Sequence, residues 1–272
     1  MTSKPRLLVF DSGLGGLTVH KALSDTLPQA ETIYVADDAA FPYGDLADQA
    51  LIERVCAVMG HLIPAFQPDL AVIACNTAST LVLPDLRSRF DLPFVGTVPA
   101  IKPAAEASLS RRIAILATPA TVKRDYTQGL IRAFAGDCDV ILHAPAQLAM
   151  RAEQVFEGGF VSDHDLRADL APCFVEADGR RTDTVVLGCT HYPLLLERFR
   201  ALAPWSVNWI DPAPAIARRA EALLASHQRL GERAAMPHSH FFINTGADDL
   251  YSRMRSPLAA YGFTMGQLWP IR

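Results

Sequence analysis

Two segments of the chain match each other, and each ends an apolar run on a cysteine. One reads Asp-Leu-Ala-Val-Ile-Ala-Cys from Asp69 to Cys75, and the other reads Asp-Thr-Val-Val-Leu-Gly-Cys from Asp183 to Cys189. An apolar run of this length predicts a buried parallel strand. Open α/β sheets bind their ligands just beyond the carboxyl ends of such strands. Two thiols at equivalent strand ends therefore predict a pair of acid/base groups that face one substrate.

Polar residues follow both cysteines. The first cysteine is followed by Asn76 and Thr77, and the second by Thr190 and His191. A free thiol has a pKa of about 8.5, which polar neighbours and the positive field of a helix amino terminus can lower to roughly 3.5–7.5. One thiolate could then remove a proton from a carbon atom while the opposite thiol delivers another. Two-base proton transfer of this kind inverts the configuration of the carbon.

Other interpretations of the cysteines remain open. A free cysteine often behaves as a small buried hydrophobe, which is the role we expect for Cys56, Cys138 and Cys173 because no polar motif surrounds them. A disulfide between Cys75 and Cys189 is disfavoured in a cytosolic protein. A zinc site is disfavoured because the chain has no Cys-x-x-Cys or His-x-x-x-His pair, so we predict no metal.

A glycine-rich segment follows the first predicted strand. It reads Asp-Ser-Gly-Leu-Gly-Gly from Asp11 to Gly16. Its glycines permit a tight turn and bring backbone N–H groups close to an anion, although a simple strand-to-helix turn would also explain them. The spacing differs from both common nucleotide-binding motifs, which disfavours a nucleotide-dependent enzyme. Asp11 could accept a substrate ammonium group or orient a neighbouring thiol.

A second loop reads Phe-Pro-Tyr-Gly from Phe41 to Gly44. On its own it indicates a rigid turn with an aromatic anchor. Alternatively, the loop contacts a ligand through the Gly44 amide and the backbone of Tyr43.

The composition excludes several classes of protein. The length of 272 residues suits about two domains, at ~150 residues each. The net charge of −4 and the lack of a basic run indicate no nucleic-acid partner. The apolar run Leu7–Phe10 is too short for a signal peptide, and no stretch approaches a membrane span. Five cysteines without a disulfide framework predict reduced thiols and a cytoplasmic protein.

Apolar runs alternate with amphipathic stretches, which is typical of βα units around a mostly parallel sheet. The predicted strands are Leu7–Phe10, Thr32–Ala36, Leu70–Ala74, Phe94–Val98, Ile113–Ala117, Val140–Ala144, Thr184–Gly188, Val207–Ile210 and Phe241–Asn244. The predicted helices are Gly16–Thr26, Ala47–Phe66, Thr80–Phe90, Thr121–Ala135, Ala146–Phe156, Leu166–Ala177, Pro193–Ala203, Pro214–Gln228 and a short closing helix from Asp248. A loop is predicted at Glu232–Ser239.

The repeat predicts an α/β fold of two pseudo-symmetric lobes, each a mostly parallel sheet flanked by helices, with the active site between them. Residues 1–98 together with 208–272 form the first lobe, which carries Cys75. Residues 99–207 form the second lobe, which carries Cys189. Each lobe has one further polar loop, which contains Asp11 in the first lobe and Thr118 in the second.

Taken together, five motifs resemble the glutamate racemases of the aspartate/glutamate racemase family. In chain order they are Asp11-Ser-Gly-Leu-Gly-Gly, Tyr34-Val-Ala-Asp, Phe41-Pro-Tyr-Gly, Ala74-Cys-Asn-Thr-Ala and Gly188-Cys-Thr-His-Tyr-Pro. The resemblance runs in order from Asp11 to about Leu224 and more weakly to the end of the chain. It implies cofactor-independent proton transfer between L- and D-glutamate, which supplies D-glutamate for peptidoglycan, and it is consistent with a homodimer.

The resemblance also implies roles for individual residues. The cysteine that matches Cys75 acts on the D-enantiomer, and the one that matches Cys189 acts on the L-enantiomer. The catalytic positions also include Asp11, His191 and an assisting glutamate, for which Glu153 is the candidate and Glu157 the alternative. The implied substrate-binding positions are Asp11, Ser12, Tyr43, Gly44, Asn76, Thr77, Thr118, Thr121, Thr190 and His191.

Two rival functions remain. A related racemase or decarboxylase on a similar scaffold would act on another substrate, such as aspartate or a hydantoin. A two-lobed binding protein would use the cysteines only for packing. The second rival predicts ligand binding without exchange of protons with solvent.

Overall fold

The computed structural model describes residues 4–226 and 240–271. It divides into two compact units, Met1–Thr97 with Ala213–Arg272 (unit 1) and Val98–Pro212 (unit 2). The chain joins unit 1 again at Ala213 rather than at residue 208. The physical reason is that strand β10 (Asn208–Ile210) pairs with a strand of unit 2.

Unit 1 is built on a six-stranded sheet in the order β12-β11-β2-β1-β3-β4, in which every neighbouring pair is parallel. The strands are β1 (Arg6–Asp11), β2 (Glu31–Ala36), β3 (Leu70–Ile73), β4 (Phe94–Gly96), β11 (His240–Asn244) and β12 (Met265–Leu268). The helices are α1 (Leu17–Thr26), α2 (Asp48–Phe66), α3 (Asn76–Arg89), α10 (Ala213–Ser226), α11 (Leu250–Arg253) and α12 (Arg255–Ala259), with short 3₁₀ turns η1 (Asp38–Ala40) and η2 (Tyr43–Asp45).

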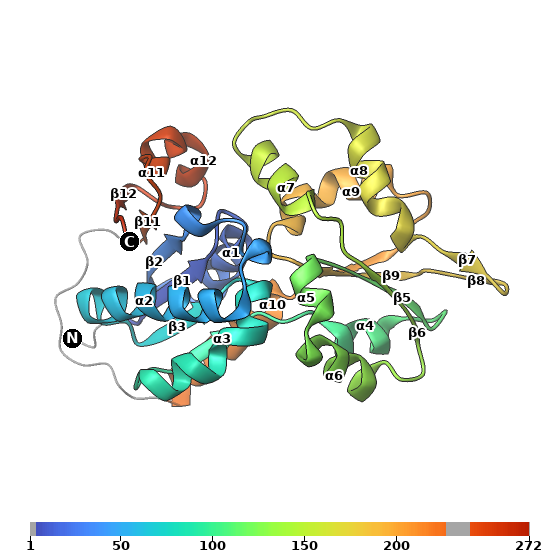
Figure 1. Ribbon diagram of the computed structural model, residues 1–272, viewed down its shortest axis with the longest axis horizontal. Helices are drawn as coiled ribbons and strands as arrows, with labels where there is room; N and C mark the ends of the chain where they lie inside the picture. The colour runs from blue at the N-terminus through green and yellow to red at the C-terminus, as the bar shows by residue number, and fades with distance from the viewer. Residues whose placement is uncertain (1–3, 227–239, 272) are drawn as a thin grey trace. The chain divides into compact units, whose positions relative to one another are not determined.

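The central strands of unit 1 are buried along their whole length. Strands buried on both faces are near-continuous apolar runs, which is why these three were predicted well from sequence. Phe10, Ile33 and Ile73 point to the face that helices α2 and α3 cover. Helix α1 packs against α10 (Figure 1). The carboxyl ends of β1, β2 and β3 therefore lie at one edge of a rigid sheet.

Unit 2 contains a four-stranded parallel sheet in the order β10-β9-β5-β6. Its strands are β5 (Arg112–Ala117), β6 (Asp139–His143), β9 (Thr184–Gly188) and β10. Its helices are α4 (Ile101–Ala107), α5 (Pro119–Lys123), α6 (Asp125–Phe134), α7 (Leu148–Phe156), α8 (Asp163–Leu170) and α9 (Leu196–Leu202), with 3₁₀ turns η3 (Ala171–Cys173) and η4 (Tyr192–Leu195).

The two faces of this sheet pack against different helices (Figure 1). Ile113 and Ile115 pack with residues of α4 and α6. Leu116 and Leu187 pack with residues of α7, α8 and α9. The alternation follows from the two-residue period of a strand. The α/β fold with parallel sheets flanked by helices, predicted from the sequence, is thus confirmed.

One predicted helix, Leu166–Ala177, is wrong in its second half. Helix α8 ends at Leu170, and Pro172 follows within η3, where a proline interrupts α-helical hydrogen bonding. The chain then forms a small antiparallel hairpin of β7 (Glu176–Ala177) and β8 (Arg180–Arg181). Its two turn residues are an Asp-Gly pair with positive φ, which favours a tight hairpin.

The carboxyl-terminal region also differs from expectation. The closing helix is two short helices, α11 and α12, and strand β12 follows them. Strand β12 was not predicted because it is short and contains Gly266, a residue type that is depleted in strands. A Cβ at Gly266 would lie 2.2 Å from the Tyr251 ring, so the packing requires glycine. Helix α4 was not predicted, and the predicted helix Thr121–Ala135 is divided into α5 and α6.

The predicted loop Glu232–Ser239 lies outside the described residues, as do the last two residues of the predicted helix Pro214–Gln228. Within residues 4–226 and 240–271, no helix is both long and apolar enough to cross a membrane.

Candidate functional site

Cys75 lies at the carboxyl edge of the unit 1 sheet, between strand β3 and helix α3. It is the N-cap residue of α3, and its side chain is almost buried at 6% exposure. The predicted helix started at Thr80, whereas α3 begins directly after the cysteine. A helix of this length directs the positive end of its dipole toward the residue that precedes it. The sulfur therefore lies in a field that favours negative charge.

The Asp11–Gly16 loop lies at the same edge because β1 and β3 are parallel neighbours. The Ala74 amide donates to the Phe10 carbonyl at 2.7 Å, which fixes the two strand ends side by side. The hydroxyl oxygen of Ser12 lies 3.9 Å from the sulfur of Cys75. Unit 1 therefore brings Asp11, Ser12 and Cys75 to one place, as the matching of strand ends predicts.

Asp11 is fully buried, and its orientation depends on a glycine. The amide of Gly16 donates to Asp11 Oδ2 at 2.5 Å. A Cβ on residue 16 would lie 2.8 Å from Asp11 Cβ and 2.9 Å from Tyr34 Oη, so only glycine fits. The Tyr34 hydroxyl in turn donates to the Gly13 carbonyl at 2.7 Å. Tyr34 thus fixes the position of the Asp11–Gly16 loop, a role that was not assigned from the sequence.

Asn76 and Thr77 form the first turn of α3 and are both buried. Neither polar atom of the Asn76 amide has a hydrogen-bond partner among the described residues. Buried polar groups are nearly always hydrogen-bonded, so an amide in this state is suited to bind a ligand.

The Phe41–Gly44 loop buries the side chain of Tyr43 inside unit 1. The Tyr43 ring is buried, and its hydroxyl donates to Asp37 Oδ2 at 2.5 Å. Burial, followed by the charge of Asp37, raises the pKa of this phenol well above its ordinary value, so it stays a donor. At Gly44 the direction in which a Cβ would point is open, with no atom within 4 Å.

In unit 2, Cys189 occupies the equivalent place after strand β9. Its side chain is 6% exposed, and its sulfur lies 3.8 Å from Nδ1 of His191. The other ring nitrogen of His191 lies 2.5 Å from Glu153 Oε2, on helix α7. Thr190 stands between the cysteine and the histidine and is also buried. The structure therefore brings a thiol, an imidazole and a carboxylate into one chain of contacts.

The electrostatics of this cluster favour a charged imidazole. Burial lowers the pKa of His191, but the negative charge of Glu153 and the hydrogen bonds to Cys189 and Glu153 act in the opposite direction. The result is a pKa well above 6.5. An imidazolium ion at 3.8 Å from the sulfur can donate a proton to a thiolate or stabilise its charge.

Thr118 and Thr121 lie after strand β5, which is the parallel neighbour of β9. Thr118 is the N-cap of α5, and its side chain accepts from the Thr121 amide at 3.2 Å. The two hydroxyl oxygens are 2.9 Å apart. Because Ala117 and Gly188 are paired in the sheet, both threonines belong to the same sheet edge as Cys189.

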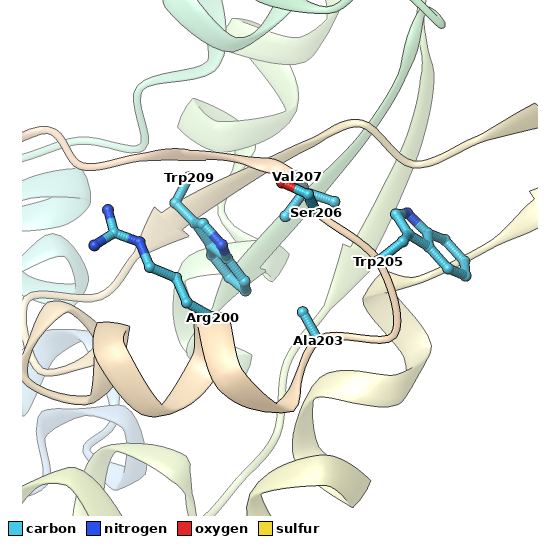
Figure 2. Close-up of a pocket in the computed structure, with 6 residues that line it drawn as sticks. All are labelled: Arg200, Ala203, Trp205, Ser206, Val207 and Trp209. Atoms are coloured by element: carbon cyan, nitrogen blue, oxygen red, sulfur yellow. The ribbon is translucent and has the colours of Figure 1, made fainter.

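No group of three or more His, Cys, Asp or Glu side chains suitable for a metal ion occurs in the part of the chain that the structure describes. All five cysteines are free thiols. A pocket of about 320 Å³ in unit 2 contains none of the predicted site residues. Figure 2 shows that its lining comes from helix α9, from the segment between α9 and β10, and from strand β10 itself. These lining residues are Arg200, Ala203, Trp205, Ser206, Val207 and Trp209.

Known proteins resemble the chain over most of its length. A family model described as Asp/Glu/Hydantoin racemase matches residues 18–220. A glutamate racemase of Brucella anthropi is 55% identical over 219 residues, which is 80% of this chain and 79% of that protein. One of Brucella canis is 49% identical over 249 residues, which is 91% of this chain and 90% of that protein.

A solved structure gives the same result. Escherichia coli glutamate racemase, crystallised with L-glutamate and the activator UDP-MurNAc-Ala, superposes with a TM-score of 0.91 at 38% identity, covering 99% of this chain and 100% of that one. The chain therefore belongs to the Asp/Glu/Hydantoin racemase family and, within it, to the glutamate racemases.

Proposed function

We propose that the protein interconverts L- and D-glutamate by cofactor-independent proton transfer at the α-carbon and supplies D-glutamate for peptidoglycan. The observation that carries the proposal is the pair of matched thiols, each at a strand end with its own set of polar neighbours. The kinship with glutamate racemases supports the choice of substrate. Cys75 is assigned to the D-enantiomer and Cys189 to the L-enantiomer.

The reaction requires one thiolate and one thiol. With L-glutamate, the Cys189 thiolate takes the α-proton, so the C–H bond breaks and an S–H bond forms. The electron pair is left on the α-carbon and is delocalised into the adjacent carboxylate. The Cys75 thiol then delivers its proton to the opposite face of the carbon and becomes a thiolate. The reverse reaction uses the same two groups in exchanged roles.

On the Cys189 side, His191 and Glu153 serve the thiol. The imidazolium stabilises the thiolate before the reaction and can exchange a proton with the sulfur afterwards. The carboxylate of Glu153 balances the charge of the imidazolium and fixes the orientation of its ring through the 2.5 Å contact. We assign the assisting role to Glu153 rather than Glu157 on the basis of this contact.

On the Cys75 side, the corresponding groups are Asp11 and Ser12. The Ser12 hydroxyl, 3.9 Å from the sulfur, can donate to the thiolate. Asp11 is a fully buried carboxyl group next to the cysteine loop, which suits it to accept the ammonium group of the substrate or to orient the thiol.

The remaining positions supply neutral hydrogen-bond donors for the two carboxylates of glutamate. They are the side chains of Asn76, Thr77, Thr118, Thr121 and Thr190 and the backbone at Tyr43 and Gly44. Hydrogen bonds from neutral donors are weaker than those from charged groups, so they can bind the carboxylates of the substrate and still allow the product to leave.

Two properties of the whole protein complete the proposal. Five free thiols suit a reducing compartment, so we place the enzyme in the cytoplasm. We also propose a homodimer, which light scattering of the purified protein tests directly.

The activity is tested with a substrate panel. Purified protein is incubated separately with each enantiomer of glutamate, with L-aspartate and with one enantiomer of a 5-substituted hydantoin. The optical rotation of each solution is followed. The proposal predicts loss of rotation with both enantiomers of glutamate and at most slow change with the others. Rotation that stays constant with glutamate while the protein is folded by circular dichroism would refute it.

A further inference from the structure

Asp37 is a buried carboxylate directly beyond the carboxyl end of strand β2, and it accepts four hydrogen bonds. The donors are Tyr43 Oη at 2.5 Å, Thr245 Oγ1 at 2.5 Å, Arg54 Nη2 at 2.5 Å and Arg54 Nε at 2.9 Å. They come from the η2 turn, helix α2 and the residue after strand β11. One side chain therefore ties three segments, remote in sequence, to the edge of the unit 1 sheet.

The same residue is fixed to the site loop through its backbone. Its amide donates to the Asp11 carbonyl at 2.8 Å, so it lies beside the start of the Asp11–Gly16 loop. Asp37 is thus adjacent to one predicted substrate-binding segment and bonded to a second one through Tyr43.

The contact with Tyr43 determines which part of that residue can meet a ligand. Because the phenol donates to a buried carboxylate, its hydroxyl points into unit 1 and is not available to a substrate. The backbone of the loop is left to do the binding. At Gly44, the next residue, the space where a Cβ would point is open.

The contact also fixes the loop in position. Hydrogen bonds to charged groups contribute about 1.5–3 kcal/mol, and those of Asp37 are sheltered from solvent. Binding groups must be held within roughly 0.5 Å of their productive positions to be effective. A loop anchored by one buried phenol meets this need without a direct contact between the anchor and the ligand.

We infer that Asp37 is a positioning residue for substrate binding, which acts through Tyr43 to hold the backbone of the Tyr43–Gly44 turn toward glutamate. The inference rests on the proposed function. It assigns Asp37 no contact with the substrate and no proton transfer.

A purely structural role for Asp37 is the competing explanation, since Arg54 also donates to the carbonyl of Ile271 and so joins the carboxyl-terminal segment to the network. The same strand offers a matched control at its other end. Glu31, the first residue of β2, forms a buried ion pair with Arg6 at 2.8 Å. Loss of either carboxylate removes the acidic partner of one arginine, but only Asp37 contacts the loop.

The test compares the variants Asp37→Asn, Glu31→Gln and Tyr43→Phe in thermal unfolding and in glutamate racemisation. Tyr43→Phe removes one hydrogen bond and leaves the Asp37–Arg54 pair intact, so it is informative even where Asp37→Asn fails to fold. Asp37→Asn and Tyr43→Phe are expected to raise KM for glutamate about tenfold, with a smaller change in kcat. Glu31→Gln is expected to lower the melting temperature and to leave KM within about twofold of the wild-type value.

The double variant distinguishes positioning from destabilisation. If Asp37 acts through Tyr43, adding Tyr43→Phe to Asp37→Asn raises KM little further, because the contact is already lost. The inference is overturned if Tyr43→Phe leaves KM unchanged, or if Asp37→Asn and Glu31→Gln change KM equally. A wild-type protein that does not racemise glutamate would refute the proposed function instead.

Discussion

The Nε2 atom of His191 lies 2.5 Å from Glu153 Oε2, in a pair whose side chains are 3% and 12% exposed. Removal of one member of such a pair leaves the other charged and poorly solvated, so the two groups are expected to act as a unit. Through its second nitrogen the histidine reaches the sulfur of Cys189.

The variant Glu153→Gln keeps the shape of the side chain and removes its charge. We expect kcat/KM to fall by roughly 10²-fold or more, within the range of assisting acid/base groups. The fall must be equal in both directions, because the two enantiomers have the same free energy and the equilibrium constant is one. Measured initial rates from L- and from D-glutamate check both points.

The matched control is Glu157→Gln. Glu157 is exposed and lies one helical turn further along the chain than Glu153. Its loss should leave kcat/KM within about twofold, as for other surface substitutions. Equal loss in the two variants would contradict the assignment of Glu153.

Stability should depend on pH through His191. Its pKa is raised in the folded protein, so the histidine contributes stability that is fully present below the unfolded value of about 6.5 and is lost as pH rises through the folded value. The difference in unfolding free energy between wild type and His191→Asn should therefore shrink as pH is raised above 6.5. Urea titrations at a series of pH values give this difference. A difference that grows with pH would show that the sign of the shift is wrong.

Replacement of either site cysteine by alanine should abolish racemisation. Each of Cys75→Ala and Cys189→Ala removes one of two required acid/base groups, so turnover should fall by at least ~10³-fold while circular dichroism is unchanged. Cys56→Ala is the control, since Cys56 is also buried but lies within helix α2. Near-normal turnover in either site variant would remove that cysteine from the mechanism.

Gly44→Ala tests the role of the loop backbone. The added Cβ meets no atom within 4 Å, and Gly44 is not among the positive-φ glycines, so the free energy of unfolding should change by less than ~1 kcal/mol. If the backbone there faces bound glutamate, the methyl group should raise KM by about tenfold. Thermal unfolding and steady-state kinetics on the same preparation separate the two effects. An unchanged KM would place the substrate elsewhere.

Much of the fold could be predicted because buried parallel strands have a strong local signal. The runs that became β1, β3, β5 and β9 are mostly apolar, and the residues that follow them marked the positions of Asp11, Cys75, Thr118 and Cys189. The weak elements were those with little local signal. Strand β12 contains Gly266, where the ring of Tyr251 leaves no room for a Cβ. This contact joins two residues that are separated in the sequence, so no local pattern indicates it.

Parts of the site could not be predicted because they depend on contacts between segments. No spacing rule links Glu153 to His191, which are 38 residues apart on different elements, so Glu153 was a candidate only through the family resemblance. Likewise, the sequence shows an aspartate after strand β2 but not that Asp37 binds Tyr43. The available signal was the polar residue directly after an apolar strand, the same signal that indicated Asp11.

Proton transfer by two thiols at one carbon atom can be followed in heavy water. L- and D-glutamate are incubated separately with the enzyme, and deuterium at the α-carbon is measured in both enantiomers during the first few per cent of conversion. Two-base transfer predicts deuterium in the newly formed enantiomer and almost none in the remaining substrate, from either starting point. Deuterium that enters the remaining substrate as fast as the product would contradict it, because a single base that exchanges the abstracted proton with solvent and then delivers deuterium to either face gives that result.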